Sequence, residues 1–198
     1  KVEANRNFAN KVWNIGRFVV NAVNRVETAA KNEPQWTLAD SWIWARTRQT
    51  VNNVNALFES CQFGEAGRQV YEFLWNDFAD WYLEASKRQL NQGGDRGAYT
   101  AMVLADVLDL MLRLLHPFTP FVTEALWGYL KEACQSSNKV YSPQQGWADH
   151  LIVAEWPEKM PNQDWEETAI KEFELIQEVV RSIRNLRSEY KVEPNKAI

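Results

Sequence analysis

A stripe of apolar side chains between residues 104 and 115 constrains the fold more than any other feature of this sequence. Its members recur at spacings of three and four residues, which places them on one face of an α-helix. They are Leu104, Val107, Leu108, Met111, Leu114 and Leu115. Such a face must be buried against other elements, so the stripe predicts a packed helical core around this segment.

Comparable patterns predict helices before this stripe. The first covers about residues 2–31, with apolar positions every three or four residues. The second begins near Thr37, because Thr37 and Asp40 have the spacing of a capping box, with Asp in place of the usual Glu. A third covers about residues 63–90, and the run Asn91-Gln92-Gly93-Gly94 ends it.

Proline and polar residues delimit the elements after the stripe. Thr119 followed by Pro120 is a suitable start for a fifth helix, over residues 121–133. Residues 134–163 predict a long, mostly irregular loop, in which residues 151–153 form one short extended piece. A last helix follows. The fold class is therefore all-α, an up-and-down helical bundle.

The whole chain, residues 1–198, is expected to form one domain. Residues 1–133 would make the main bundle, residues 134–163 the loop and residues 164–190 the C-terminal helix. The sequence ends at Ile198 as if unfinished and starts without a signal-peptide pattern, so we expect it to be part of a longer protein. No stretch approaches the roughly 20 apolar residues of a membrane span.

Residues that carry catalysis or bind metals are scarce. The two cysteines, Cys61 and Cys134, exclude a disulfide scaffold and a CxxC zinc site, and we expect both to be buried and inert. His116, before Pro117, is interpreted as a helix-end residue. Neither a glycine-rich phosphate loop nor a pair of histidines at metal-ligand spacing is present. We therefore expect no catalytic residue, metal or cofactor in this chain.

The first helix carries a second stripe that suits RNA. The net charge of the chain is -4, yet residues 1–31 hold six basic and two acidic residues. Lys11, Asn14 and Phe18 share a stripe about a quarter turn from the apolar face, and Arg25 extends it. An aromatic ring among basic and amide groups suits stacking on a base. Alternatively, Phe18 packs against a neighbouring helix and the polar groups are solvated.

The third helix holds one apolar residue outside its apolar arc. Leu83 falls on the polar side, between Asn76 and Lys87, where it either touches a base or is an ordinary exposed leucine. Trp75 and Trp81 lie within the arc, so we expect both in the core.

The last helix carries a basic ridge. Arg181, Arg184 and Arg187 recur at every third residue. This ridge either contacts phosphates or is a solvated face paired with Glu178 and Glu189.

Several segments resemble the anticodon-binding domain of the valyl-tRNA synthetase family, and together they cover nearly the whole chain. Residues 3–14 read EANRNFANKVWN, similar to the family's EANRNFxNKLWN. Residues 38–43 read LADSWI, with Ser41 where Arg is usual. Residues 71–84 read YEFLWNDFADWYLE, a specific match, whereas residues 114–124, LLHPFTPFVTE, are similar to several related class I synthetases.

The resemblance implies a domain that recognises the anticodon of valine tRNA and leaves the chemistry to the rest of the synthetase chain. It implies that Lys11, Phe18 and Leu83 meet anticodon bases, and we add Asn14 and Arg17 as neighbours. The candidates for contacts with the tRNA backbone are Arg25, Lys87, Arg181, Arg184 and Arg187. The isolated chain is then no enzyme. Its parent would be a cytoplasmic valine–tRNA ligase that uses ATP and Mg²⁺.

Two alternatives stay open. The first is the same module from an isoleucyl or another related class I synthetase, which an exchange of the anticodon would distinguish. The second is a structural helical domain that docks a protein partner. Binding to RNA weakens steeply with salt because counterions are released from phosphates, whereas docking of a protein need not.

Overall fold

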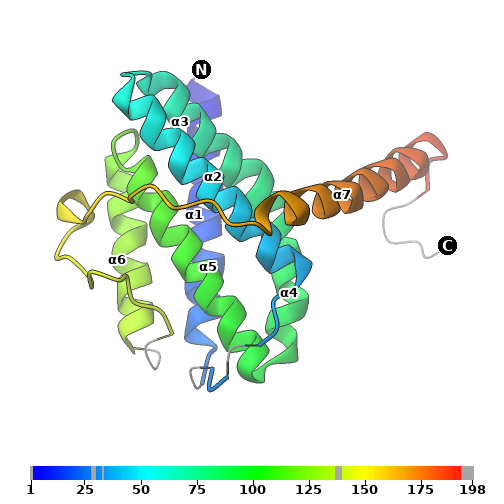
Figure 1. Ribbon diagram of the computed structural model, residues 1–198, viewed down its shortest axis with the longest axis horizontal. Coiled ribbons are helices and arrows are strands. Elements are labelled where there is room, and N and C mark those ends of the chain that lie inside the picture. Colours follow the sequence, from blue (N-terminus) through cyan, green and yellow to red (C-terminus); the bar gives the residue numbers. More distant parts are fainter. Residues whose placement is uncertain (1, 28–29, 33, 137–139, 193–198) are drawn as a thin grey trace.

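The computed structural model describes residues 2–27, 30–32, 34–136 and 140–192, which fold as a helical bundle without any strand among them. The all-α prediction is confirmed. The elements are α1 (Val2–Asn24), α2 (Leu38–Glu59), α3 (Phe63–Glu72), η1 (Phe73–Tyr82), α4 (Leu83–Gln92), α5 (Gly94–Leu115), α6 (Pro120–Ser136), η2 (Leu151–Val153) and α7 (Glu166–Glu189). Figure 1 shows α7 projecting from the side of the bundle.

The helix α5 is the centre of the bundle. It packs against α1, α2, α3, α4 and α6. All six members of the stripe predicted from the sequence are buried, each with at most 2% of its surface exposed. Burial of a large aliphatic side chain contributes about 1.5–3 kcal/mol, so this helix holds the others together. It ends at Leu115, and His116 is its C-cap, which confirms the interpretation of His116 as a helix-end residue. The Nδ1 atom of His116 lies 2.9 Å from Thr123 Oγ1.

The helix α1 is shorter than the sequence predicts. It ends at Asn24 instead of residue 31, because the amides of Arg25 and Val26 bond to carbonyls three residues back and close the last turn. The following loop is tied to the start of α5, where Asp95 Oδ1 accepts a bond of 3.0 Å from the backbone amide of Lys31. Arg25 therefore lies just beyond the helix end.

The predicted third helix contains a π-helical segment, η1, between α3 and α4. In an α-helix, residues five apart lie about 140° from each other, but i→i+5 bonding brings them together. The rings of Phe73 and Phe78 stack in this way, with centroids 6.3 Å apart.

This change of register overturns two predictions. Leu83, expected on the polar side, is a core residue with 8% of its surface exposed. Trp75 and Trp81, expected in the core, are half-buried at its edge. A projection at 100° per residue assumes an α-helix, so it gives the wrong face for Leu83 and for the two tryptophans once the helix has widened.

The last part of the chain differs from the prediction in detail. Residues 151–153 form a 3₁₀ turn, η2, instead of an extended piece. The helix α7 packs on α2, where Phe173 stacks on Trp42 with centroids 4.1 Å apart. Cys134 is buried as expected, and burial raises the pKa of its thiol to about 12, but Cys61 is exposed.

One face of α7 is apolar and exposed. Its large side chains at the surface are Leu175, Ile176, Val179, Ile183, Leu186 and Tyr190.

A buried carboxylate, Asp40, joins four helices. The capping box predicted at the start of α2 is present, with Thr37 N and Oγ1 each 2.9 Å from Asp40 Oδ2. The same oxygen accepts a bond of 2.7 Å from Arg96, and Oδ1 accepts one of 3.0 Å from Tyr82. Burial raises the pKa of Tyr82 well above its usual value, so its hydroxyl stays protonated and donates. Gln89 of α4 donates to Thr37 Oγ1.

Asp40→Ala should lower the free energy of unfolding by about 3–5 kcal/mol, because it leaves the buried Tyr82 hydroxyl without its acceptor and removes the carboxylate that pairs with the partly buried Arg96. Urea unfolding followed by circular dichroism measures this change. The exposed Asp164, replaced in the same way, should change stability by less than about 0.5 kcal/mol. Equal stability of the two variants would contradict this role for Asp40.

A second polar cluster lies beside α6 and the long loop. Asp109 accepts bonds from Arg113, from Trp127 Nε1 at 2.6 Å and from Tyr141 at 3.0 Å. Burial raises the pKa of the neighbouring Asp106 to about 7, and the charge of Asp109 adds to this effect. Asp106 therefore stays largely protonated in the folded protein below about pH 7.

Asp106→Asn should stabilise the protein at pH 8 by about 1–3 kcal/mol. The unfolded carboxyl titrates near pH 4, so the folded state holds the extra proton between about pH 4 and 7, and stability falls as pH rises through this window. The variant should lose that part of the slope in urea unfolding measured from pH 4 to 8. Asp109→Asn, the control, should instead destabilise at every pH, and a destabilised Asp106→Asn at pH 8 would refute the assignment.

Candidate RNA-binding cleft

A cleft of about 550 Å³ opens between α1, α4 and the start of α5. It lies at the end of the bundle where α1 ends and α5 begins (Figure 1). Its lining residues from α1 and the segment after it are Phe18, Asn21, Ala22, Arg25, Val26 and Glu27, and those from α4 and α5 are Leu90, Asn91, Gly93, Gly94, Gly97 and Ala98.

Glycines shape the far wall of the cleft. Gly93 and Gly94 have φ angles of 66° and 54°, a conformation that side chains with a Cβ rarely adopt, and they form the sharp turn between α4 and α5. At Gly97, a Cβ would lie 3.3 Å from the carbonyl oxygen of Leu90, so the glycine permits α5 to pass close to the end of α4. The run predicted to end the third helix therefore also builds the cleft.

Phe18 joins the core to the cleft. Its half-buried ring packs against the core and also lines the cleft, so the two interpretations of Phe18 are compatible. Asn21, Arg25 and Asn91 are exposed around it. An aromatic face with amide and guanidinium donors beside it is suited to stack a base and bond its edge or phosphate. The sequence pattern marked Asn91 only as part of a helix end.

Lys11 lies two turns before Phe18 on α1, about 10 Å along the helix axis. Its Nζ is 2.9 Å from Asp80 Oδ1 and 3.8 Å from the centroid of the Trp75 ring. The side chain of Lys11 is 23% exposed. Sequence patterns did not single out Asp80 or assign Trp75 to this site, because both belong to the π-helical segment.

Other predicted residues lie nearby on α1 and α4. Asn14 is exposed on α1, between Lys11 and Phe18 in sequence. Lys87 is exposed on α4 and pairs with Glu84 at 2.6 Å. Lys87 precedes the cleft residue Leu90 by three positions. The two side chains are therefore about a sixth of a turn apart around the helix axis, on the same side of α4. Leu83 lies one further turn back, but it is buried in the core.

Four predicted cations lie elsewhere. Arg17 lines a different groove, between α1 and α6. Arg181 and Arg184 lie over the ring of Trp81, 5.7 Å and 5.6 Å from it, between α7 and η1. Arg187 is half-buried further along α7. The basic ridge is therefore not part of the cleft.

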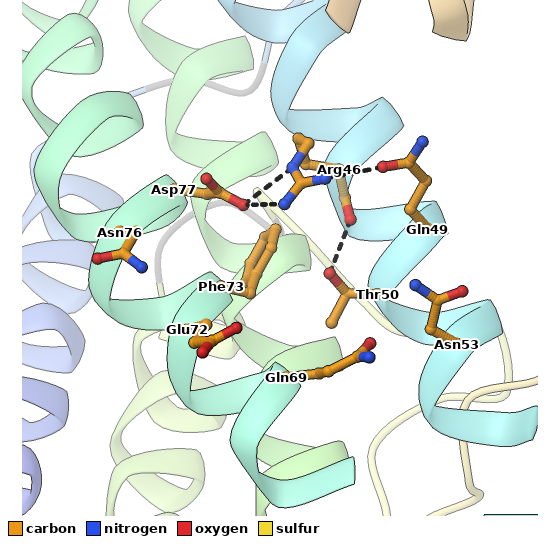
Figure 2. Close-up of a pocket in the computed structure, with 9 residues that line it drawn as sticks. All are labelled: Arg46, Gln49, Thr50, Asn53, Gln69, Glu72, Phe73, Asn76 and Asp77. Carbon is orange, nitrogen blue, oxygen red and sulfur yellow. Dashed lines mark hydrogen bonds and ion pairs between the residues drawn. The ribbon is translucent and has the colours of Figure 1, made fainter. Parts of the chain in front are cut away.

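A smaller polar cavity of about 280 Å³ lies between α2 and the α3–η1 helix (Figure 2). Arg46 crosses it and holds Asp77 Oδ2 through Nε and Nη2, both at 2.9 Å, while its Nη1 donates to Gln49. Burial raises the pKa of Asp77, and the charge of Arg46 opposes that rise. Since its charged groups satisfy each other, this cavity is a weaker candidate than the cleft.

The bundle, with a polar cleft lined by the Phe18 ring, Arg25 and Glu27, defines an all-α binding domain. The family model described as the anticodon-binding domain of tRNA ligase matches residues 40–198, and the chain belongs to this family. Similar curated relatives include the valine–tRNA ligases of Enterococcus faecalis and Geobacillus stearothermophilus, each 40% identical, and that of Bacillus subtilis, 38% identical. Each match covers all of this chain but only 21% of the relative's length.

None of the helices in the described ranges combines the length and the apolar character that a membrane span requires. No group of three or more His, Cys, Asp or Glu side chains in that part of the chain could hold a metal ion.

Leu83→Ala should lower the free energy of unfolding by about 2–5 kcal/mol, because the side chain fills part of the core. Lys87→Ala, on the same helix but exposed, should change it by less than about 0.5 kcal/mol. Urea denaturation of both variants gives the comparison. If Leu83→Ala were as stable as Lys87→Ala, the position of Leu83 in the core would be refuted.

Proposed function

We propose that this domain binds the anticodon loop of valine tRNA and positions the tRNA for aminoacylation by another part of a longer valine–tRNA ligase. Membership of the anticodon-binding family supports the ligand class. The names of relatives that match the whole chain support valine. In that protein, the catalytic part would use ATP with Mg²⁺ in the cytoplasm.

The observation that carries this proposal is the half-buried ring of Phe18 in the cleft, with Asn21, Arg25 and Asn91 exposed around it. Anticodon bases are unpaired, so a protein can stack one on an aromatic ring and bond the edge of the next. Phe18 would supply the stack. Arg25 would meet a phosphate or a base edge, and the two amides would bond base edges.

The core supports the geometry that such recognition needs. Phe18 is held from behind by the core, so its ring does not have to be ordered when RNA binds. The Gly93–Gly94 turn keeps the far wall short and leaves backbone accessible at the cleft. The overall charge of -4 opposes non-specific binding, so recognition would depend on the cleft itself.

A second function, docking of a protein segment, is favoured by the exposed apolar face of α7. That face lies on the projecting helix (Figure 1). None of its six large side chains lines the cleft. The two functions are compatible in a longer protein, since they use separate surfaces. Salt distinguishes them, because only binding to phosphates loses affinity steeply as salt is raised.

Phe18→Ala should weaken binding to a valine tRNA transcript by about 5- to 150-fold, the loss of one stacked base. The dependence of affinity on salt should stay nearly unchanged, because no charge is removed. Fluorescence anisotropy at several salt concentrations, corrected for the folded fraction from circular dichroism, measures both quantities.

Tyr129→Ala is the matched control, because Tyr129 is an exposed aromatic residue in the groove on the other side of α1. Its loss should leave affinity unchanged. The proposal fails if the folded Phe18→Ala protein binds as tightly as the original chain. It also fails for valine if the original chain prefers an isoleucine anticodon.

A further inference from the structure

The Lys11 ammonium is held by two side chains of a different helix. Asp80 Oδ1 accepts its hydrogen bond, and the Trp75 ring lies beneath it. Trp75 is itself stacked on Tyr71 with centroids 5.6 Å apart, and Tyr71 contacts Phe8 with centroids 4.4 Å apart. The ammonium therefore rests on an aromatic layer that reaches the core. We call Trp75 and Asp80 the lysine seat.

The π-helical form of η1 makes this seat. Trp75 and Asp80 are five residues apart, and in an α-helix they would point about 140° away from each other. With i→i+5 bonding they come to one face, as Phe73 and Phe78 do on the buried side. The widened segment thus turns one pair of side chains into the core and the other pair toward α1.

The seat changes what Lys11 can recognise. The carboxylate of Asp80 neutralises the ammonium and would repel a phosphate brought close to it. An ammonium has three N–H donors, and Asp80 takes one, so the other donors can still serve a neutral acceptor. Base edges carry such acceptors. Holding the flexible lysine stem in place before binding also lowers the entropic cost of that contact.

We propose that Trp75 and Asp80 are positioning residues that hold Lys11 to read a base edge instead of a phosphate. This inference rests on the proposed function of the cleft. It assigns specificity to Lys11 and general affinity to other cations near the cleft, such as Arg25.

The test measures the affinity of the 198-residue chain for a valine tRNA transcript and for the same transcript with an exchanged anticodon, over a range of salt. Lys11→Ala should lower the preference for the cognate anticodon at least about fivefold and leave the salt slope unchanged. Asp80→Asn should lower the preference similarly, but steepen the slope by about one unit, because the freed ammonium then meets a phosphate. Asp80→Glu should restore most of the preference.

Glu72→Gln is the matched control, since it removes an exposed carboxylate that pairs with Arg68 on α3. It should leave the preference unchanged. A shallower salt slope for Lys11→Ala with its preference intact would show that Lys11 meets a phosphate and would overturn the inference. The original chain could prefer the cognate anticodon while its Asp80→Asn variant shows the same preference. That result would overturn the role of the lysine seat but not the proposed function. A chain that binds neither transcript would overturn both the proposed function and this inference.

Discussion

The carboxylate of Asp40 fixes the geometry on which the cleft depends. It is fully buried, and it joins the start of α2 to Tyr82 at the end of η1 and to Arg96 near the start of α5. Gln89 connects α4 to the same network through Thr37 and also accepts a bond from Thr100. Gln89 and Arg96 flank the turn that forms the far wall of the cleft. A charge this deeply buried is tolerated only with several partners. Through them the network joins α4 and α5, the two helices that face α1 across the cleft.

The two long walls of the site differ in the way they are built. The α1 wall is a regular helix whose apolar stripe packs on α5 and α6, so Lys11 and Phe18 keep a fixed spacing. The opposite wall changes from π-helix to α-helix at Leu83, and the two forms present different faces. The π-helical part faces Lys11 with a ring and a carboxylate, and the α-helical part ends in the glycine turn. The α1 wall therefore sets the distance between Lys11 and Phe18, and the η1–α4 wall sets the chemical surroundings of Lys11.

Much of the fold could be predicted from local patterns. The α5 stripe, the capping box of Thr37 and Asp40, the start of α6 at Pro120 and the helix end at His116 all depend on residues close in sequence. Features that depend on tertiary contacts could not be predicted. Lys11 and Asp80 are separated by 69 positions.

The candidate site could be predicted only in part, because local patterns group residues of one helix but not residues of different helices. The stripe on α1 correctly grouped Phe18 with Arg25, because both lie on or next to one regular helix. The basic ridge on α7 was a valid pattern, but Arg181 and Arg184 lie over Trp81 in a groove that also contains Asp80, and neither lines the cleft. The wrong position of Leu83 had a different cause, the assumption of α-helical geometry through the π-helical segment.

In the proposed complex, RNA enters between α1 and the η1–α4 helix. This path can be tested by titrating the ¹⁵N-labelled chain with an RNA hairpin that carries the valine anticodon and following amide and indole chemical shifts. The large shift changes should fall on residues 11–27, residues 75–98 and the Trp75 indole. Changes concentrated instead on Arg46, Gln49 and Gln69 of the polar cavity, or on Leu126 and Tyr129 of the groove between α1 and α6, would contradict it.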